Sequence, residues 1–181
     1  MPDTQDSGRR EEFTAFFAAR HQHARRTAYL LCGDWHWADD LAQVAFVRLA
    51  AAWDRVREPA ALDAFLRTCL VRAYLAEAGR AWRRREASVA DLPDAAPRSG
   101  RDESGEAVDR TVFMAALRRV PPRQRATLVC RFYQGLDVAE TAAVLRCSVG
   151  AVKSQTSRGL TALRAVLGES ITVDAMVEVE R

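Results

Sequence analysis

Four polar side chains suited to contacts with nucleic acid lie close together near the end of the chain: Lys153, Ser154, Gln155 and Arg158. Lysine and arginine pair with phosphate oxygens, while amide and hydroxyl groups can hydrogen-bond to base edges in the major groove. Lys153 is also the only lysine in a chain with 27 basic residues. These residue types at this spacing predict a helix that reads DNA.

Two short helices around a tight turn, between Asp137 and Arg164, are expected to position these groups. Ser148 lies where an N-cap is needed, because its hydroxyl can accept from the free amides of the next turn. The small residues Ala142 and Ala143 would let a second helix cross closely. Apolar residues recur at helical spacing on both sides of the turn: Ala139, Leu145, Val152, Leu160 and Leu163. The pattern alone also fits an amphipathic helical hairpin with a solvated charged face.

Charge is distributed unevenly along the chain. The net charge is +3, but residues 106–168 hold 10 basic against 4 acidic residues, which favours an electrostatic DNA footprint there. A composition of 49% apolar and 28% charged residues is ordinary for a soluble globular protein. No apolar run is long enough for membrane insertion, and the polar N-terminal segment is unlike a signal peptide, so we expect a cytoplasmic protein.

Cofactor chemistry and catalysis are not expected from these residues. The four cysteines are isolated in apolar helical stretches and predict buried free thiols: Cys32, Cys69, Cys130 and Cys147. The histidines near Cys32 match no compact metal-ligand spacing: His21, His23 and His36. Neither a glycine-rich phosphate loop after a strand nor a nucleophile elbow is present, so the chain is not expected to be an enzyme.

The predicted fold class is all-α, with two small helical domains joined by a flexible linker. Residues 10–85 form the first domain, 86–105 the linker, 106–168 the second domain and 169–181 an acidic tail. Helices are expected at 11–31, 36–53, 60–85, 108–119 and 122–133, before the helix pair. The apolar residues expected to form the first core include Phe13, Phe16, Phe17, Tyr29, Leu30, Leu41, Val44, Phe46, Val47, Leu49, Phe65, Leu66, Leu70 and Val71.

Two motifs in a fixed order resemble those of extracytoplasmic-function (ECF) sigma factors of bacterial RNA polymerase. Residues 39–48, DDLAQVAFVR, are similar to the family pattern A-[ED]-D-L-x-Q-x-[AT]-F-x-R. Residues 117–164 are similar to the second motif region, with L-P-x-R-Q-R, G-x-x-x-x-E-x-A and V-K-S-x-x-S-R. The V-K-S-Q-T-S-R form is common in an actinobacterial, sigma-E-like branch. The resemblance covers most of residues 10–168.

The resemblance implies that the second helix docks on the clamp helices of core RNA polymerase. The positions concerned are Asp40, Gln43, Phe46 and Val47. Polar groups would set the register while an apolar anchor supplies buried area. Read without the resemblance, Asp39 and Asp40 are helix-start charges favoured by the dipole, and Phe46 belongs to the core. The resemblance favours contact roles for Asp40 and Gln43 and leaves both readings of Phe46 open.

The resemblance also implies that the third helix and the loop before it, about residues 56–62, open and read the minus-10 element. The positions expected to contact DNA there are Arg67, Arg72, Tyr74 and Arg80, with the basic run Arg83 to Arg85 following. Many relatives have Asn where this chain has Arg72. Arg72 can serve a guanine edge or a phosphate, so the base preference of the family does not carry over.

For the second domain, the resemblance implies binding to the minus-35 duplex and to the polymerase flap. Its contact residues are expected to be Lys153, Ser154, Gln155 and Arg158, with Arg123 and Arg125 as secondary backbone contacts. Arg146 replaces the Gly of many relatives in the turn, and Ala151 replaces their Thr. The turn can still form with a non-glycine residue, but the phosphate contacts of the family are in doubt there.

The implied function is an alternative sigma factor that directs transcription initiation. An anti-sigma factor is frequent in the family, and one would have to cover the Gln43 or Lys153 surfaces. Two other readings are a helix-turn-helix transcriptional regulator that binds DNA without polymerase and a helical module that binds only protein. A regulator with a receiver domain would show alternating strands and helices in residues 1–85, and this sequence does not.

Overall fold

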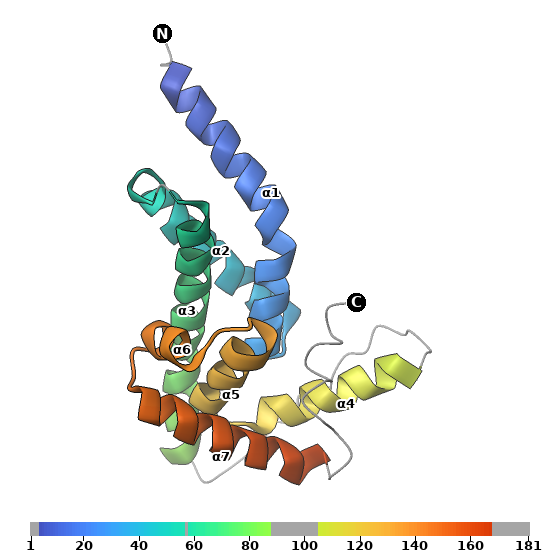
Figure 1. Ribbon diagram of the computed structural model, residues 1–181. Helices are drawn as coiled ribbons and strands as arrows, with labels where there is room; N and C mark the ends of the chain where they lie inside the picture. The colour runs from blue at the N-terminus through green and yellow to red at the C-terminus, as the bar shows by residue number, and fades with distance from the viewer. Residues whose placement is uncertain (1–3, 57, 88–104, 168–181) are drawn as a thin grey trace. The chain divides into compact units, whose positions relative to one another are not determined.

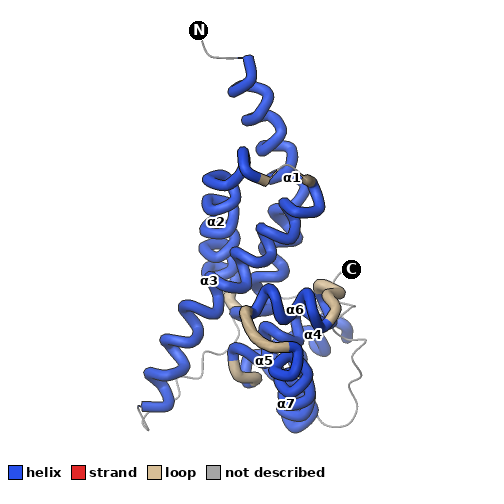
Figure 2. Tube along the Cα trace, turned by 60° about the vertical axis from the view of Figure 1, so that its left-hand side comes forward, coloured by secondary structure: helices blue, strands red, loops and turns tan. Residues whose placement is uncertain are grey.

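The computed structural model describes residues 4–56, 58–87 and 105–167. Every regular element in these ranges is a helix, as Figure 2 shows, and the predicted all-α fold class is confirmed. Contacts divide the chain into two units at Tyr74 and Leu75, and each unit is described by itself. Most of the predicted linker 86–105 and all of the predicted tail 169–181 lie outside the described residues.

The first unit is built on two packed helices and the start of a third (Figure 1). Its elements are α1 (Thr4–Cys32), α2 (Trp35–Ala52), the short 3₁₀-helix η1 (Trp53–Arg55) and α3, which begins at Pro59 and runs to Ala87. The three predicted helices are therefore present, and α1 begins one to two turns earlier than expected. The largest fully buried side chains are Leu30, Leu31, Leu41, Leu49, Leu70, Val71 and Tyr74.

Three apolar residues expected in this core are exposed instead: Phe17 at 38%, Val44 at 36% and Val47 at 62%. Helical spacing identifies an apolar stripe, but the breadth of the buried part depends on the neighbouring helices. Phe13 and Phe16 do pack edge-on against Trp53, with ring centroids 5.1 and 5.5 Å away. The outer side of α2 thus carries two valines that its own unit leaves uncovered.

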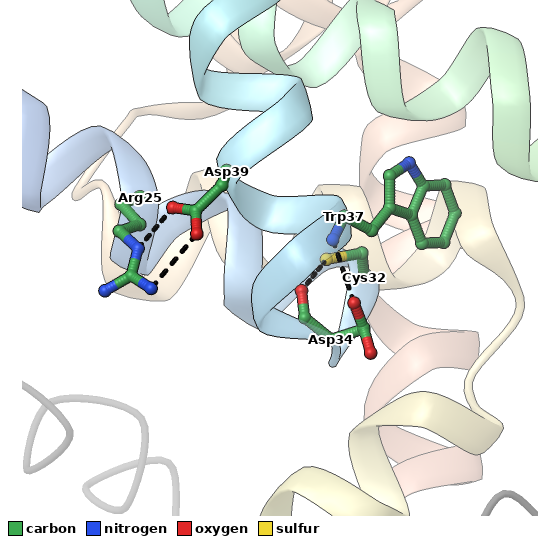
Figure 3. Close-up of polar contacts among 5 residues, drawn as sticks. All are labelled: Arg25, Cys32, Asp34, Trp37 and Asp39. Carbon is green, nitrogen blue, oxygen red and sulfur yellow. Dashed lines mark hydrogen bonds and ion pairs between the residues drawn. The ribbon is translucent and has the colours of Figure 1, made fainter.

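The turn between α1 and α2 is fixed by short polar contacts, drawn in Figure 3. Gly33 has φ 73°, a left-handed conformation that suits glycine. Asp34 then caps α2, because its carboxylate accepts from the Trp37 amide at 2.8 Å. The Cys32 thiol donates to the Asp34 carbonyl at 3.1 Å. These contacts set where α2 begins.

Besides the end of α3, from Leu75 on, the second unit contains the later helices. They are α4 (Gly105–Arg119), α5 (Pro122–Leu128), the π-helical turn η2 (Val129–Tyr133), α6 (Val138–Leu145) and α7 (Val149–Leu167). The single helix predicted for 122–133 is thus α5 followed by a widened turn. In that turn the Gln134 amide donates to the Val129 carbonyl, five residues earlier, at 2.9 Å. Figure 1 shows α6 and α7 as the orange and red helices.

Helices α5 and α7 approach each other at Gly159. A Cβ atom there would lie 3.2 Å from Cγ and Cδ1 of Leu128 and 3.4 Å from Cβ of Gln124. Leu128 is fully buried, so it has little room to give way. The close crossing predicted at Ala142 and Ala143 concerned another pair of helices, α6 and α7; Ala142 is buried, but Ala143 is exposed. The residue that permits the α5–α7 approach is Gly159.

Gly159→Ala should lower the free energy of unfolding of the second unit by about 1–3 kcal/mol, because the methyl group would overpack against Leu128. Gly150→Ala, in the same helix, is the matched control. The nearest atom to its added Cβ is Ser148 Oγ at 3.9 Å, and alanine favours helix by up to about 1 kcal/mol. Thermal unfolding of both variants should therefore give shifts of opposite sign. Equal shifts would show that the Gly159 contact is not tight.

Candidate functional site

The outer side of α7 presents the polar residues predicted to meet DNA. Lys153, Ser154 and Arg158 are exposed, while Gln155 is half-buried. The opposite side is packed: Val152 is fully buried and Leu163 is 7% exposed. Three of the four predicted contact residues are therefore free of the core and open to a ligand. The fourth lies at the border of the packed side.

One further exposed residue on this surface, Ser157, was not anticipated from the sequence. It lies three residues after Ser154 and four after Lys153, so the three side chains are neighbours on the helix surface. The signal was present in that spacing, but a serine inside a helix has no distinctive chemistry of its own. The outer surface of α7 is thus formed by Lys153, Ser154, Ser157 and Arg158.

Both helices of the helix-turn-helix begin at defined caps. The predicted N-cap of α7 is confirmed, because the Ala151 amide donates to Ser148 Oγ at 3.1 Å. Helix α6 begins with a reciprocal capping box that the sequence reading missed. There the Glu140 amide donates to Asp137 Oδ1 at 2.7 Å, and the Asp137 amide donates to Glu140 Oε2 at 2.8 Å. The order Asp, two residues, Glu before an apolar run was a readable signal for it.

The turn between α6 and α7 uses Arg146 in a left-handed conformation, φ 49° and ψ 57°. It is the only non-glycine residue with positive φ in the described ranges. The turn is closed by the Cys147 amide, which donates to the Ala142 carbonyl at 3.0 Å. The expectation that a non-glycine residue can form this turn is confirmed. Its exposed guanidinium adds positive charge beside the start of α7.

Arg125, predicted as a DNA backbone contact, is buried, and that prediction is wrong for its side chain. The residue is 6% exposed, and its guanidinium donates to the carbonyls of Arg118 and Val120, the latter at 3.0 Å. These carbonyls lie at the end of α4, where helix acceptors lack partners within the helix. Arg125 therefore ties α4 to α5. Arg123, two residues earlier, is exposed and remains available to a phosphate.

On α3, three of the four minus-10 positions retain solvent access. Arg80 is exposed, whereas Arg67 and Arg72 are half-buried. The Arg67 Nε atom is buried without a hydrogen-bond partner in the described ranges. Tyr74 is 1% exposed, and its ring centroid lies 5.8 Å from that of Trp37. The prediction that Tyr74 contacts DNA is wrong, because the ring belongs to the core of the first unit. The side chains of residues 83–85 lie outside the described part.

On α2, the polar positions predicted to meet polymerase are on the surface, and the aromatic one is not. Asp40 and Gln43 are exposed, and Val47 is the most exposed large apolar residue of the first unit. Phe46 is 4% exposed and packs edge-on against Phe17, with centroids 4.7 Å apart. Phe46 therefore cannot be the apolar anchor. Exposed Val44 stands three residues before Val47 and was not anticipated as a contact.

The two adjacent acidic residues of the α2 motif have different environments. Asp39 accepts from the Arg25 guanidinium through both oxygens, one at 3.1 Å, as Figure 3 shows. This hydrogen bond, together with the positive charge of Arg25, lowers the pKa of Asp39 below its usual value. Arg25 also lies over the Trp35 ring, 4.6 Å from its centroid. Asp39 thus holds α1 to α2, and Asp40 is the carboxylate that faces outward.

Other kinds of site have little support in the described part of the chain. No three His, Cys, Asp or Glu side chains are grouped there so as to hold a metal ion. All four cysteines are free; Cys32 and Cys130 are buried as predicted, and Cys69 and Cys147 are half-buried. Burial raises the pKa of the Cys69 thiol, which disfavours the reactive thiolate. None of the helices described is both long and apolar enough to cross a membrane.

The structure combines a first helical unit that has an exposed polar and apolar surface on α2 with a unit that contains a helix-turn-helix, an arrangement typical of helical DNA-binding proteins. Comparison with known families agrees in both parts. Residues 16–85 match the family described as Sigma-70 region 2, and residues 110–163 match Sigma-70, region 4. The predicted linker therefore lies between the two matched regions.

Individual relatives lead to the same family. The RNA polymerase sigma-E factor of Streptomyces avermitilis is 35% identical over 164 residues, covering 91% of this chain and 89% of the relative. The ECF RNA polymerase sigma factor SigM of Mycobacterium tuberculosis is 32% identical, covering 90% and 80%. The chain belongs to the ECF family of RNA polymerase sigma factors.

A solved structure shares the fold. The sigma factor RpoE of Bartonella quintana, in complex with the anti-sigma factor NepR, aligns with a TM-score of 0.65 at 23% identity. The alignment covers 89% of this chain and 99% of that chain.

Arg125→Ala should lower the free energy of unfolding by about 2–4 kcal/mol, because it removes charge-assisted hydrogen bonds to buried carbonyls. Arg123→Ala, which removes an exposed guanidinium from the same helix, should change it by less than about 0.5 kcal/mol. Chemical denaturation of the two variants measures the difference. If Arg125→Ala lowers the free energy of unfolding as little as Arg123→Ala does, Arg125 does not tie α4 to α5 and becomes a candidate for DNA contact again.

Proposed function

We propose that this chain is an ECF sigma factor that binds core RNA polymerase and directs it to promoters with minus-10 and minus-35 elements. The observation that carries the proposal is the presence of both sigma-70 regions in one chain, each with an exposed surface of suitable chemistry. The chemical step of transcription then belongs to polymerase, and the chain acts in the cytoplasm, where polymerase is found.

The polymerase surface that we propose is the outer side of α2, formed by Asp40, Gln43, Val44 and Val47. Two exposed valines beside an exposed carboxylate and an amide provide an apolar centre and polar groups that set register. Asp39 is not included, because both of its oxygens accept from Arg25. The apolar contact assigned to Phe46 from the sequence passes to Val44 and Val47.

The DNA surfaces that we propose lie on α3 and α7. Arg67, Arg72 and Arg80 would meet the minus-10 region as cations beside a single strand. The outer surface of α7, together with Arg123, would meet the minus-35 duplex. Ten basic against four acidic residues in 106–168 support an attraction to phosphate.

A regulator that binds DNA without polymerase is less well supported, because residues 16–85 match a sigma region and not a receiver domain. The sigma factor RpoE of Bartonella quintana is bound to an anti-sigma factor in its solved structure, which supports an anti-sigma factor as a further partner of this chain. Such a partner would compete for the α2 or α7 surfaces.

The proposal is tested by mixing the purified chain with core RNA polymerase at low salt and following co-elution, then footprinting on genomic fragments. The expected result is a stable complex that protects promoter DNA, with little protection by the chain alone. Specific protection by the chain in the absence of polymerase would favour the free-standing regulator. Absence of any complex with core polymerase would refute the sigma reading.

Val47→Ala should weaken binding to core polymerase roughly fivefold, since burying its side chain in the complex is worth about 1 kcal/mol relative to alanine. Val112→Ala is the matched control: this valine is 49% exposed on α4, a helix of the second unit that is not part of the proposed surface. Competition against a fluorescent wild-type chain measures both affinities. If the two substitutions have equal effects, the α2 surface is not the docking site.

A further inference from the structure

Gln155 lies at the border of the packed side of α7, whereas Lys153 and Ser154 point away from that side. It is half-buried and comes one turn before Gly159, the residue at which α7 approaches α5. Residues four apart lie on the same side of a helix, so Gln155 and Gly159 both face α5. Lys153 and Ser154 are exposed on the outer side. Gln155 is therefore placed for a contact inside the protein.

That contact is with Thr127 of α5. The Thr127 hydroxyl, which has one proton to donate, lies between two acceptors: Oε1 of Gln155 at 3.1 Å and the carbonyl oxygen of Arg123 at 2.8 Å. Thr127 is fully buried, so its side chain cannot itself touch DNA. A glutamine that reads adenine uses its amide oxygen and its amide nitrogen together. Here the amide oxygen of Gln155 is directed toward a group on α5.

The contact between Gln155 and Thr127 is directional, which the approach of the two backbones at Gly159 is not. Gly159 lets the two backbones come close, but it has no side chain with which to fix rotation or sliding of α7. A hydrogen bond is directional, and this one lies one turn nearer the start of α7, beside Lys153 and Ser154. It can therefore hold the outer surface of α7 at a defined angle to α5.

We propose that Gln155 is a positioning residue: its hydrogen bond to Thr127 orients α7 for the minus-35 duplex, and Gln155 does not read a base. This inference rests on the proposed function of the second unit. It predicts that loss of the hydrogen bond lowers affinity and loosens the base preference at every minus-35 position to a similar degree, because every contact made by the outer surface shifts together.

The test uses holoenzyme reconstituted with core polymerase and a duplex library randomised at the minus-35 positions, behind a fixed minus-10 region from a promoter that the wild type transcribes. Thr127→Val removes the hydroxyl at nearly constant volume, and Gln155→Ala removes its partner. Each should bind the selected duplex about three- to tenfold more weakly, with the base frequencies at every position loosened alike. The double variant should bind no more weakly than either single variant.

Thr127→Ser is the control that separates positioning from stability. It keeps the hydroxyl and should retain wild-type binding, although loss of a buried methyl group lowers its melting temperature. Thr127→Val should show the opposite order, with a melting temperature at least as high as that of Thr127→Ser and weaker binding. Binding that simply follows melting temperature would overturn the inference.

Two further outcomes are decisive. If Gln155→Ala loosens the base frequency at one position and Thr127→Val leaves it unchanged, Gln155 reads a base and the inference fails while the proposed function stands. If the wild-type holoenzyme selects no minus-35 sequence, the proposed function of the second unit fails.

Discussion

The approach of α5 to α7 at Gly159 is the contact on which the DNA-facing surface depends. A side chain at that position would meet buried Leu128, so the angle at which α7 leaves the unit follows from the absence of one. Helix α5 is in turn held to the end of α4 by the buried guanidinium of Arg125. The orientation of Lys153 is therefore set by residues that themselves meet no ligand.

In the first unit, one side of α2 packs in the core and the other side is exposed to a partner. Phe46 and Leu49 face inward, and Val47 faces outward. The pairing of Arg25 with Asp39 fixes the edge between these sides and satisfies one of the two adjacent carboxylates. What is left on the outside combines apolar area with few charges, as the centre of a protein interface requires.

Local signals were readable from the sequence, and tertiary ones were not. The helices and the Ser148 cap were predicted because they depend on neighbours within a few residues. Tyr74 was assigned to DNA because the resemblance places its helix at the minus-10 element, and Arg125 because it stands at a helix start with a cationic side chain. Only the packing of other helices shows that both are buried. Gly159 inside an apolar helical pattern is compatible with a close backbone approach, but the sequence does not show that the approaching helix is α5.

Lys153 is the only lysine of the chain, and it stands exposed on the outer side of α7. Reagents that modify side-chain amines therefore have one target in this protein. An acyl group on that amine would cancel its charge without touching the arginines that supply the rest of the basic field. Shielding of this single amine would also report directly whether the surface is occupied, by nucleic acid or by an inhibitor protein.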